Sequence, residues 1–257
     1  MGRLSDLFNR KQRNVLNVYC TAGFPDLGST IPVMQAIQES GADIIELGMP
    51  YSDPLADGPV IQASSSVALQ NGMTLEVLFD QLRVMRANIH VPVILMGYMN
   101  PVMQFGFERF CRKASEVGVD GVILPDLPEF EFENEYGPII KKHGLDAIFL
   151  VTPETSEDRV RKLDALSSGF LYAVSSSSIT GSDKNMDEVG SYLKRLHGYG
   201  LKNPILVGFG IRDKTTFDQA CTNAHGAIIG TAFIQAISGP ANDLSAIPAF
   251  IKNIIGT

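Results

Sequence analysis

The chain has 257 residues, of which 45% are hydrophobic and 19% are charged, and its formal net charge is −7. This balance is typical of a globular protein with a sizeable core, and an acidic chain without a basic cluster argues against a nucleic-acid or anionic-membrane surface. Cys20, Cys111 and Cys221 are far apart and show no CxxC spacing. We therefore expect no disulfide, no zinc site and a reducing, cytoplasmic setting, and the absence of a signal-peptide core or an apolar run of about 18 residues fits that expectation.

Short apolar runs alternate with helical patterns along the whole chain. Runs rich in β-branched residues predict strands, and the amphipathic stretches between them predict helices. The predicted elements, in chain order, are a helix over 4–11, a strand over 15–21, a helix over 29–40, a strand over 43–48, a helix over 75–88, a strand over 91–97, a helix over 107–117, a strand over 121–125, a helix over 131–143, a strand over 147–152, a helix over 156–168, a strand over 170–175, a helix over 186–197, a strand over 205–209, a helix over 214–222, a strand over 227–230 and a helix over 244–255.

Strict alternation of strands and helices predicts an α/β fold with parallel strands and right-handed crossovers. Eight such units close most economically into a (β/α)8 TIM barrel, here with an extra N-terminal helix. The rival is a doubly wound open sheet, but the first strand is followed by Cys20-Thr-Ala-Gly-Phe-Pro and not by GxGxxG. No composition shift or polar linker divides the chain, so we expect residues 1–257 to form a single domain.

A lone carboxylate, Glu46, lies inside the second predicted strand, and Asp53 and Asp57 follow on a loop stiffened by prolines. Parallel strands are covered on both faces, so burial should raise the pKa of Glu46 toward the range where a carboxyl can give and take protons near neutral pH. The alternative is a structural ion pair with a buried Lys or Arg. No basic residue lies between Arg13 and Arg83, so such a partner would come from far along the chain.

The barrel places this carboxylate close to where active sites lie in the fold. Catalytic groups of these barrels gather at the carboxyl ends of the strands. Side chains alternate along a strand, so Ile44, Glu46 and Gly48 share one face. If that face is the interior, Glu46 lies near the top of the barrel, and Asp57 belongs to the loop directly above it.

Each of the last three predicted strands ends in a glycine-rich turn: Ile179-Thr-Gly181, Val207-Gly-Phe-Gly210 and Ile229-Gly230-Thr231. Glycine lets backbone N–H groups approach an anion closely, and the helix beginning at Thr231 adds oriented donors. Loops after strands seven and eight form a common phosphate site in such barrels. The turns therefore predict a phosphate site; the alternative is that these glycines only permit tight turns.

Residues 46–62, Glu46-Leu-Gly-Met-Pro-Tyr-Ser-Asp-Pro-Leu-Ala-Asp-Gly-Pro-Val-Ile-Gln62, closely resemble the signature of the tryptophan synthase α subunit family. Supporting motifs follow in the family's order: Gly97-Tyr-Met-Asn-Pro101, Pro125-Asp-Leu-Pro128, Ser178-Ile-Thr-Gly181, Gly208-Phe-Gly210 and Gly230-Thr-Ala232. The resemblance implies a (β/α)8 lyase that cleaves indole-3-glycerol phosphate to indole and glyceraldehyde 3-phosphate. It also implies an αββα heterotetramer in which the β subunit, and not this chain, holds pyridoxal phosphate.

The resemblance assigns roles to the two carboxylates. Glu46 would be the general acid/base, which protonates the indole ring carbon and takes the proton of the glycerol hydroxyl. Asp57, on a wetter loop, would stay ionised, hold the indole N–H and stabilise positive charge on the ring. Two environments that separate two carboxyl pKa values suit these two roles.

Further binding residues follow from the same matching. Tyr19 and Tyr172 resemble pocket walls and Phe209 a stacking residue, although each could be an ordinary core aromatic. Thr180, beside Gly181, resembles a residue that steadies the catalytic Asp when the loop over 175–187 closes. Ser176 and Ser178 stand where the common pattern has Arg and Gly, so closure of this loop is where the chain departs from the family.

Four residues, Asp53, Pro54, Asn100 and Pro101, are expected on the rim that faces the β subunit. The four histidines precede strands or end a helix, so we expect surface or capping roles for them and no metal site.

Three other functions stay open. A different phosphate-binding barrel enzyme would typically depend on a catalytic Lys or Cys at a strand end. A non-catalytic regulatory subunit would not need both carboxylates. A stand-alone lyase that releases free indole without a partner is the alternative that the sequence separates least well.

Overall fold

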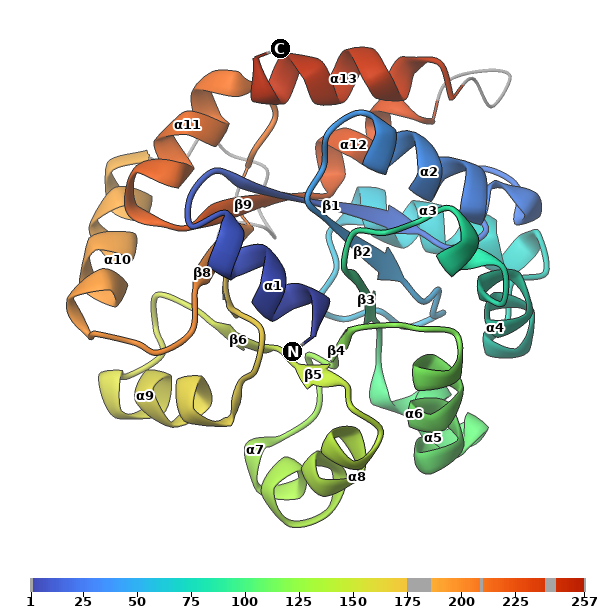
Figure 1. The fold of residues 1–257 in the computed structure, drawn as a ribbon, viewed down its shortest axis with the longest axis horizontal. Coiled ribbons are helices and arrows are strands. Elements are labelled where there is room, and N and C mark those ends of the chain that lie inside the picture. Colours follow the sequence, from blue (N-terminus) through green and yellow to red (C-terminus); the bar gives the residue numbers. More distant parts are fainter. Residues whose placement is uncertain (1, 175–185, 209, 239–243, 257) are drawn as a thin grey trace.

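The computed structural model describes residues 2–174, 186–208, 210–238 and 244–256, with the side chains of 186–188 left aside. Its nine strands are all parallel and pair in the order β5-β4-β3-β2-β1-β9-β8-β7-β6. Figure 1 shows them as a ring at the centre of the molecule with the helices around it. The predicted TIM barrel is confirmed.

The strands occupy the eight predicted positions, and the fifth is divided in two. Between its two parts, the backbone N–H of Ile148 donates to the carbonyl of Val122 at 3.1 Å. The first part, β5, pairs with β4, and the second part, β6, pairs with β7. These two strands stand at opposite ends of the strand order but are nearly continuous in sequence, so the ring nearly closes. The strands are β1 (Val15–Thr21), β2 (Ile44–Gly48), β3 (Val93–Met96), β4 (Gly121–Ile123), β5 (Asp146–Ala147), β6 (Phe149–Val151), β7 (Leu171–Val174), β8 (Ile205–Gly208) and β9 (Gly226–Ile229).

Helices cover the outside of the strands and one end of the ring. The helices are α1 (Arg3–Arg10), α2 (Thr30–Glu39), α3 (Pro59–Gln70), α4 (Leu75–Leu82), α5 (Met99–Phe105), α6 (Phe107–Glu116), α7 (Glu129–Glu131), α8 (Gly137–Lys142), α9 (Glu157–Leu166), α10 (Met186–Gly198), α11 (Lys214–Asn223), α12 (Thr231–Ala236) and α13 (Ala246–Ile255). Short 3-10 turns lie at η1 (Leu27–Ser29) and η2 (Met85–Ala87), and a π-helical turn, η3 (Phe132–Tyr136), joins α7 to α8.

The helix pattern differs from the prediction in three places. The predicted helix over 131–143 is broken into α7, η3 and α8, because Pro138 has no amide hydrogen to give and the wider π turn accommodates the lost bond. The predicted helix over 75–88 ends at Leu82, and η2 follows. Two helices that the sequence analysis did not predict, α3 and α5, follow β2 and β3.

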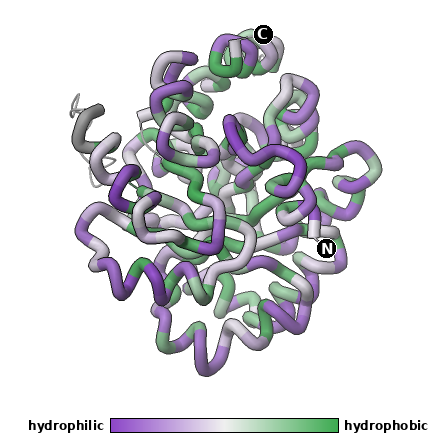
Figure 2. Tube along the Cα trace, turned by 60° about the vertical axis from the view of Figure 1, so that its left-hand side comes forward, coloured by the Kyte–Doolittle hydropathy of each residue, from purple (hydrophilic) through white to green (hydrophobic). Residues whose placement is uncertain are grey.

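Two apolar layers build the core. The larger lies between the strands and the surrounding helices, and the smaller fills the barrel itself. The smaller layer takes one residue from nearly every strand, such as Val15, Ile44 and Ile228, and is closed from below by Leu4 and Leu7 of α1. Figure 1 shows α1 lying across this end, and Figure 2 shows the hydrophobic residues concentrated on the strands and the hydrophilic ones on the outer turns. Toward the opposite end of the barrel, at the carboxyl ends of the strands, the interior face carries polar side chains such as Glu46.

Among the described helices, none has both the length and the hydrophobicity that a bilayer span requires. Within the same residues, no group of three or more His, Cys, Asp or Glu side chains is arranged to hold a metal ion.

Candidate active site

Glu46 lies on the interior face of β2, with only 1% of its surface exposed. Its Oε2 accepts a hydrogen bond of 2.8 Å from Nδ2 of Asn17 on the neighbouring strand β1. Burial raises the pKa of Glu46 to about 8; the Asn17 bond opposes that rise, and the charge of Asp57 adds to it. A carboxyl with this pKa holds its proton at neutral pH and can still release it.

Other buried carboxylates of the described residues have the partners that Glu46 lacks. Asp120 forms ion pairs with Arg3 at 2.9 Å and Arg86 at 2.5 Å, and Asp164 accepts from two backbone amides at 2.8 and 3.0 Å. The hydrogen-bond partner of Glu46 is a neutral amide, and none of the ion pairs among the described residues includes it. The alternative of a structural ion pair at Glu46 therefore fails, because a carboxylate kept for stability would have a charged or backbone donor.

Asp57 lies on the loop between β2 and α3, just before the N-cap glycine of α3. It is partly buried, and burial raises its pKa to about 6, while a hydrogen bond with Tyr98 holds that pKa down. The Tyr98 hydroxyl also accepts from the backbone N–H of Ala56 at 3.0 Å, which ties the loop to the end of β3. Asp57 is thus less exposed to solvent than expected. The order of the two pKa values is the expected one, with Asp57 mainly ionised at neutral pH and Glu46 mainly protonated.

The two predicted wall tyrosines each lie against a glycine of an adjacent strand. A β-carbon at Gly48 would be 2.1 Å from the Tyr19 hydroxyl oxygen, and one at Gly208 would be 2.4 Å from the ring of Tyr172. These glycines make room for the rings at the mouth of the barrel. Burial is the main cause that raises the pKa of each tyrosine, and electrostatic interaction with Glu46 and Asp57 raises it further, so the two carboxyls and the two phenols face one region.

The predicted phosphate residues are only partly described. Gly230 is the N-cap of α12, Thr231 is its exposed first residue, and a β-carbon at Gly230 would lie 3.6 Å from Cβ of Tyr19. The glycine turn after β9 is therefore next to the tyrosine wall. Gly210 is exposed, with a positive φ of 45°. Three further predicted residues, Thr180, Gly181 and Phe209, lie outside the described residues, as do Ser176 and Ser178.

The rim residues come from consecutive strand ends. Asp53 is exposed on the loop after β2, but Pro54 is buried. Asn100 and Pro101, expected in a loop, lie instead in the first turn of α5. Nδ2 of Asn100 donates to the Tyr51 hydroxyl at 2.9 Å, so the segments after β2 and β3 are bonded together.

Large apolar side chains stand exposed in the same rim segments, which the sequence analysis did not anticipate. Leu55 is 92% exposed, Met103 46% and Phe130 69%. They follow β2, β3 and β4, respectively. Exposed apolar side chains on segments that follow neighbouring strands are typical of a protein–protein contact surface.

Two contacting residues, Asn17 and Tyr98, were not predicted. Asn17 was visible as the one amide in an otherwise apolar strand, and Tyr98 stood in a quoted motif without a role. Each bonds one of the two carboxyls.

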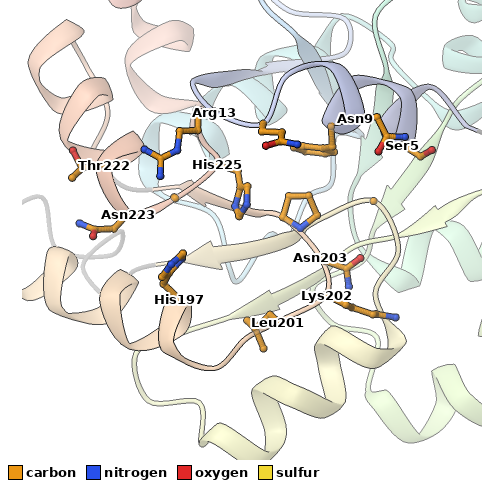
Figure 3. Close-up of a pocket in the computed structure, with 15 residues that line it drawn as sticks. Ser5, Asn9, Arg13, His197, Leu201, Lys202, Asn203, Thr222, Asn223 and His225 are labelled. Carbon is orange, nitrogen blue, oxygen red and sulfur yellow. The ribbon is translucent and has the colours of Figure 1, made fainter.

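A separate cavity of about 650 Å3 opens at the α1 end of the barrel (Figure 3). Its lining includes Arg13, His197, Lys202 and His225, and no carboxylate among the described residues. The Nδ1 of His225 accepts from the backbone N–H of Ile205 at 3.0 Å, which fits the capping role expected for the histidines. None of the predicted site residues lines this cavity, so it is distinct from the carboxylate site.

Known proteins resemble this chain along nearly its whole length. Residues 6–252 match the family described as tryptophan synthase alpha chain. The chain is 50% identical to the tryptophan synthase alpha chain of Flavobacterium johnsoniae over 89% of its length and 91% of that protein, and 46% identical to that of Parabacteroides distasonis over 98% of both. Among solved structures, tryptophan synthase subunit alpha from Legionella pneumophila superposes with a TM-score of 0.91 at 33% identity, covering 100% of this chain and 98% of that one.

Proposed function

The chain belongs to the tryptophan synthase alpha chain family, and from this membership we propose a mechanism for its reaction, the cleavage of indole-3-glycerol phosphate by a lyase, in which Glu46 and Asp57 are the catalytic residues. The single observation that carries the proposal is the pair of carboxyls at the mouth of one barrel, with Glu46 buried on β2 and Asp57 on the loop before α3; burial raises their pKa values to about 8 and about 6. The group with the higher value can deliver a proton, and the other can hold a negative charge.

Glu46 supplies the proton movements. Its carboxyl protonates the indole ring carbon that bears the glycerol chain, and the resulting carboxylate takes the proton of the adjacent hydroxyl. The carbon–carbon bond then breaks, an aldehyde forms, and the bonding electrons return to the ring. The same carboxyl ends the step protonated, so one residue serves as acid and base.

Asp57 stabilises the charge that this step creates. Protonation of the ring carbon leaves a positive charge spread toward the indole nitrogen, and an ionised carboxylate that accepts the indole N–H favours that state over the neutral substrate. Tyr98 supports the ionised form, because its bond lowers the pKa of Asp57.

Tyr19, Tyr172 and Phe209 are proposed to hold the indole ring. The phosphate is proposed to lie at Gly210, Gly230 and Thr231, with Thr180 and Gly181 completing the site. The position of Gly230 beside Tyr19 supports this arrangement, because it puts the glycine turn at the edge of the same pocket. Helix N-termini and glycine turns offer backbone N–H groups to an anion without a basic side chain.

The state of the three thiols argues against one alternative, a barrel enzyme with a catalytic cysteine. All three cysteines are buried, and burial raises the pKa of Cys111 and of Cys221 to about 12 and that of Cys20 further still. A thiol with such a pKa is almost entirely protonated at neutral pH and is a poor nucleophile.

Membership of the family implies a complex with a β subunit. We propose that the complex is an αββα heterotetramer, that the β subunit holds pyridoxal phosphate, and that residues 1–257 work as one domain in the cytoplasm. The contact surface would be the rim that carries Asp53, Pro54, Asn100 and Pro101. The exposed side chains of Leu55, Met103 and Phe130 support this choice.

Indole release measured with and without the β subunit tests the proposal. Strong activation by the β subunit is expected, whereas fast release by the isolated chain would favour a stand-alone lyase. Leu55→Ser should weaken activation without changing the isolated chain, because Leu55 is 92% exposed and has little packing to lose. Val84→Ser, at a 60% exposed residue outside the rim, is the matched control.

A further inference from the structure

Asn17 is a fully buried amide inside the barrel. Its exposed fraction is 0%, and its strand neighbours on the interior face are Val15 and Tyr19. In the sheet it stands opposite Ile44 of β2 and Ile228 of β9. A buried amide in such surroundings is costly unless its polar atoms are bonded, so its presence calls for a specific partner.

The one bond that the structure gives to the Asn17 side chain goes to the catalytic carboxyl. Nδ2 donates to Oε2 of Glu46 at 2.8 Å, and Oδ1 is buried without a partner among the described residues. A residue kept for stability would have both ends of its amide satisfied. Of the residues that the structure describes, Glu46 alone therefore orients the amide.

We propose that Asn17 is a positioning residue that permanently occupies Oε2 of Glu46 and so makes Oε1 the atom that gives and takes the proton. An N–H donor can bond an oxygen of a carboxylate and, less strongly, the carbonyl oxygen of a carboxylic acid, so the bond can persist in both protonation states while favouring the charged one. It bonds less well to the hydroxyl oxygen of that acid, so the proton is directed to Oε1. The inference rests on the proposed role of Glu46 as acid and base.

This arrangement keeps the carboxyl in place through the whole reaction. Oε1–H passes its proton to the ring carbon, and Oε1 then takes the hydroxyl proton as the carbon–carbon bond breaks, so no proton is lost or gained overall. The Asn17 bond is present before and after each transfer. Nothing has to reorient between the acid step and the base step, which is the advantage of a preorganised site.

Asn17 is the group around Glu46 that can hold its carboxyl in place. Within the part of the chain that the structure describes, the titratable groups that interact with Glu46 are Asp57 on the loop above, Tyr19 and Cys20 on β1, and Tyr172 on β7, and none of them is cationic. Burial and Asp57 both raise the pKa of Glu46, and the Asn17 bond is the influence that lowers it.

Two substitutions test the inference on the free protein. In Asn17→Leu the donor is lost at similar volume, and the unpartnered Oδ1 is removed with it, so the fold should survive. In Asn17→Asp the shape is kept but a second carboxyl faces Glu46. Thr21→Val is the matched control, since Thr21 lies on the same strand and is 2% exposed, and its hydroxyl bonds Ser64 at 2.7 Å and the Tyr19 hydroxyl at 3.5 Å but not Glu46.

The readout is the carbon-13 signal of the Glu46 carboxyl, followed against pH and assigned by its loss in Glu46→Gln. In Asn17→Leu we expect the pKa to rise by about one pH unit, a tenfold change, because a bond to the charged form is gone. In Asn17→Asp the upper apparent pKa of the carboxyl pair should also rise. The Thr21→Val signal should titrate as in the unaltered protein. An unchanged Glu46 titration in both Asn17 variants would overturn the inference.

Kinetics separate this inference from the proposed function. For Asn17→Leu we expect kcat for indole release to fall by about tenfold or more, with KM changed by less than about threefold, and the basic limb of the pH profile to move upward. A rise in KM with kcat unchanged would contradict a positioning role. If Glu46→Gln stays active, the proposed function fails whatever Asn17 does; if Glu46→Gln is inactive but the Asn17 variants keep kcat and titrate normally, only the present inference fails.

Discussion

The hydroxyl group of Tyr19 occupies the space in which a β-carbon at residue 48 would stand, because that carbon would lie 2.1 Å from the hydroxyl oxygen of Tyr19. Tyr19 also stands opposite Glu46 in the pairing of β1 with β2. The wall of the pocket and the proton donor are therefore set by the same two strands, and a glycine two residues beyond Glu46 fixes how the wall is placed.

Gly48→Ala should move the Tyr19 ring out of its place. We expect a rise in KM for indole-3-glycerol phosphate and a loss of about 1–3 kcal/mol in the free energy of unfolding, the usual cost of overpacking a core. Urea unfolding and steady-state kinetics measure both. Gly28→Ala is the control, because an added β-carbon at Gly28 meets no atom within 4 Å. Equal behaviour of the two variants would contradict the packing role of Gly48.

Tyr98→Phe removes the bond that holds down the pKa of Asp57. That pKa, about 6, should rise, so a smaller fraction of Asp57 is ionised at neutral pH. The acid limb of the plot of kcat/KM against pH is expected to shift to higher pH, so that activity is restored when the pH is raised. Tyr136→Phe is the control, because the ring of Tyr136 packs against Phe107 and its hydroxyl bonds Glu135 and not Asp57; it should leave the pH profile unchanged. A loss of activity that is the same at every pH would argue against this role.

Glu46→Gln should change how stability depends on pH. Burial raises the pKa of Glu46 from 4.5 to about 8, so the folded state binds a proton that the unfolded state releases. The contribution of Glu46 protonation to the free energy of unfolding is therefore fully present below about pH 4.5. It is lost as the pH rises from there to about 8, by at most about 1.4 kcal/mol per pH unit. The variant lacks this loss and should exceed the unaltered protein in stability at pH 8 but not at pH 5. Urea midpoints at the two pH values decide, and a constant difference would be inconsistent with a raised pKa.

Gly230→Asp tests the phosphate site through charge. The nearest atom to an added β-carbon is 3.6 Å away, so a side chain is sterically tolerated, but a carboxylate there repels the phosphate. We expect KM to rise by about tenfold or more with a smaller change in kcat. Gly230→Asn has the same shape without the charge and should raise KM less. Equal KM values for the two variants would place the phosphate elsewhere.

Much of the fold could be predicted because strand positions depend on local patterns. The first strand, Val15–Thr21, has the bounds expected from its run of β-branched and aromatic residues. Helix α3 escaped prediction because its sequence, with three consecutive serines at 64–66 and Pro59 at its start, lacks an amphipathic repeat. Helix α5 escaped because Pro101 resembles a turn residue, although proline is accepted in the first turn of a helix.

The carboxyl pair could be singled out from the sequence because Glu46 is a charged residue in an apolar strand, which is a signal in the sequence itself. Asn17, the hydrogen-bond partner of Glu46, could not be predicted in the same way. The bond from Asn17 joins residues 29 apart in the chain, and the register of β1 with β2 that brings them together is a property of the sheet. The same is true of Tyr98, which reaches Asp57 only because the loop after β2 folds back over the end of β3.

The central claim is that one carboxyl moves the protons while the other stays ionised to hold the indole. It is tested most directly by measuring indole release from indole-3-glycerol phosphate with Glu46→Gln and Asp57→Asn, each checked for folding by circular dichroism and thermal unfolding. The account predicts that each folded variant loses at least about 100-fold in kcat. A folded Glu46→Gln protein that releases indole at the unaltered rate would contradict it.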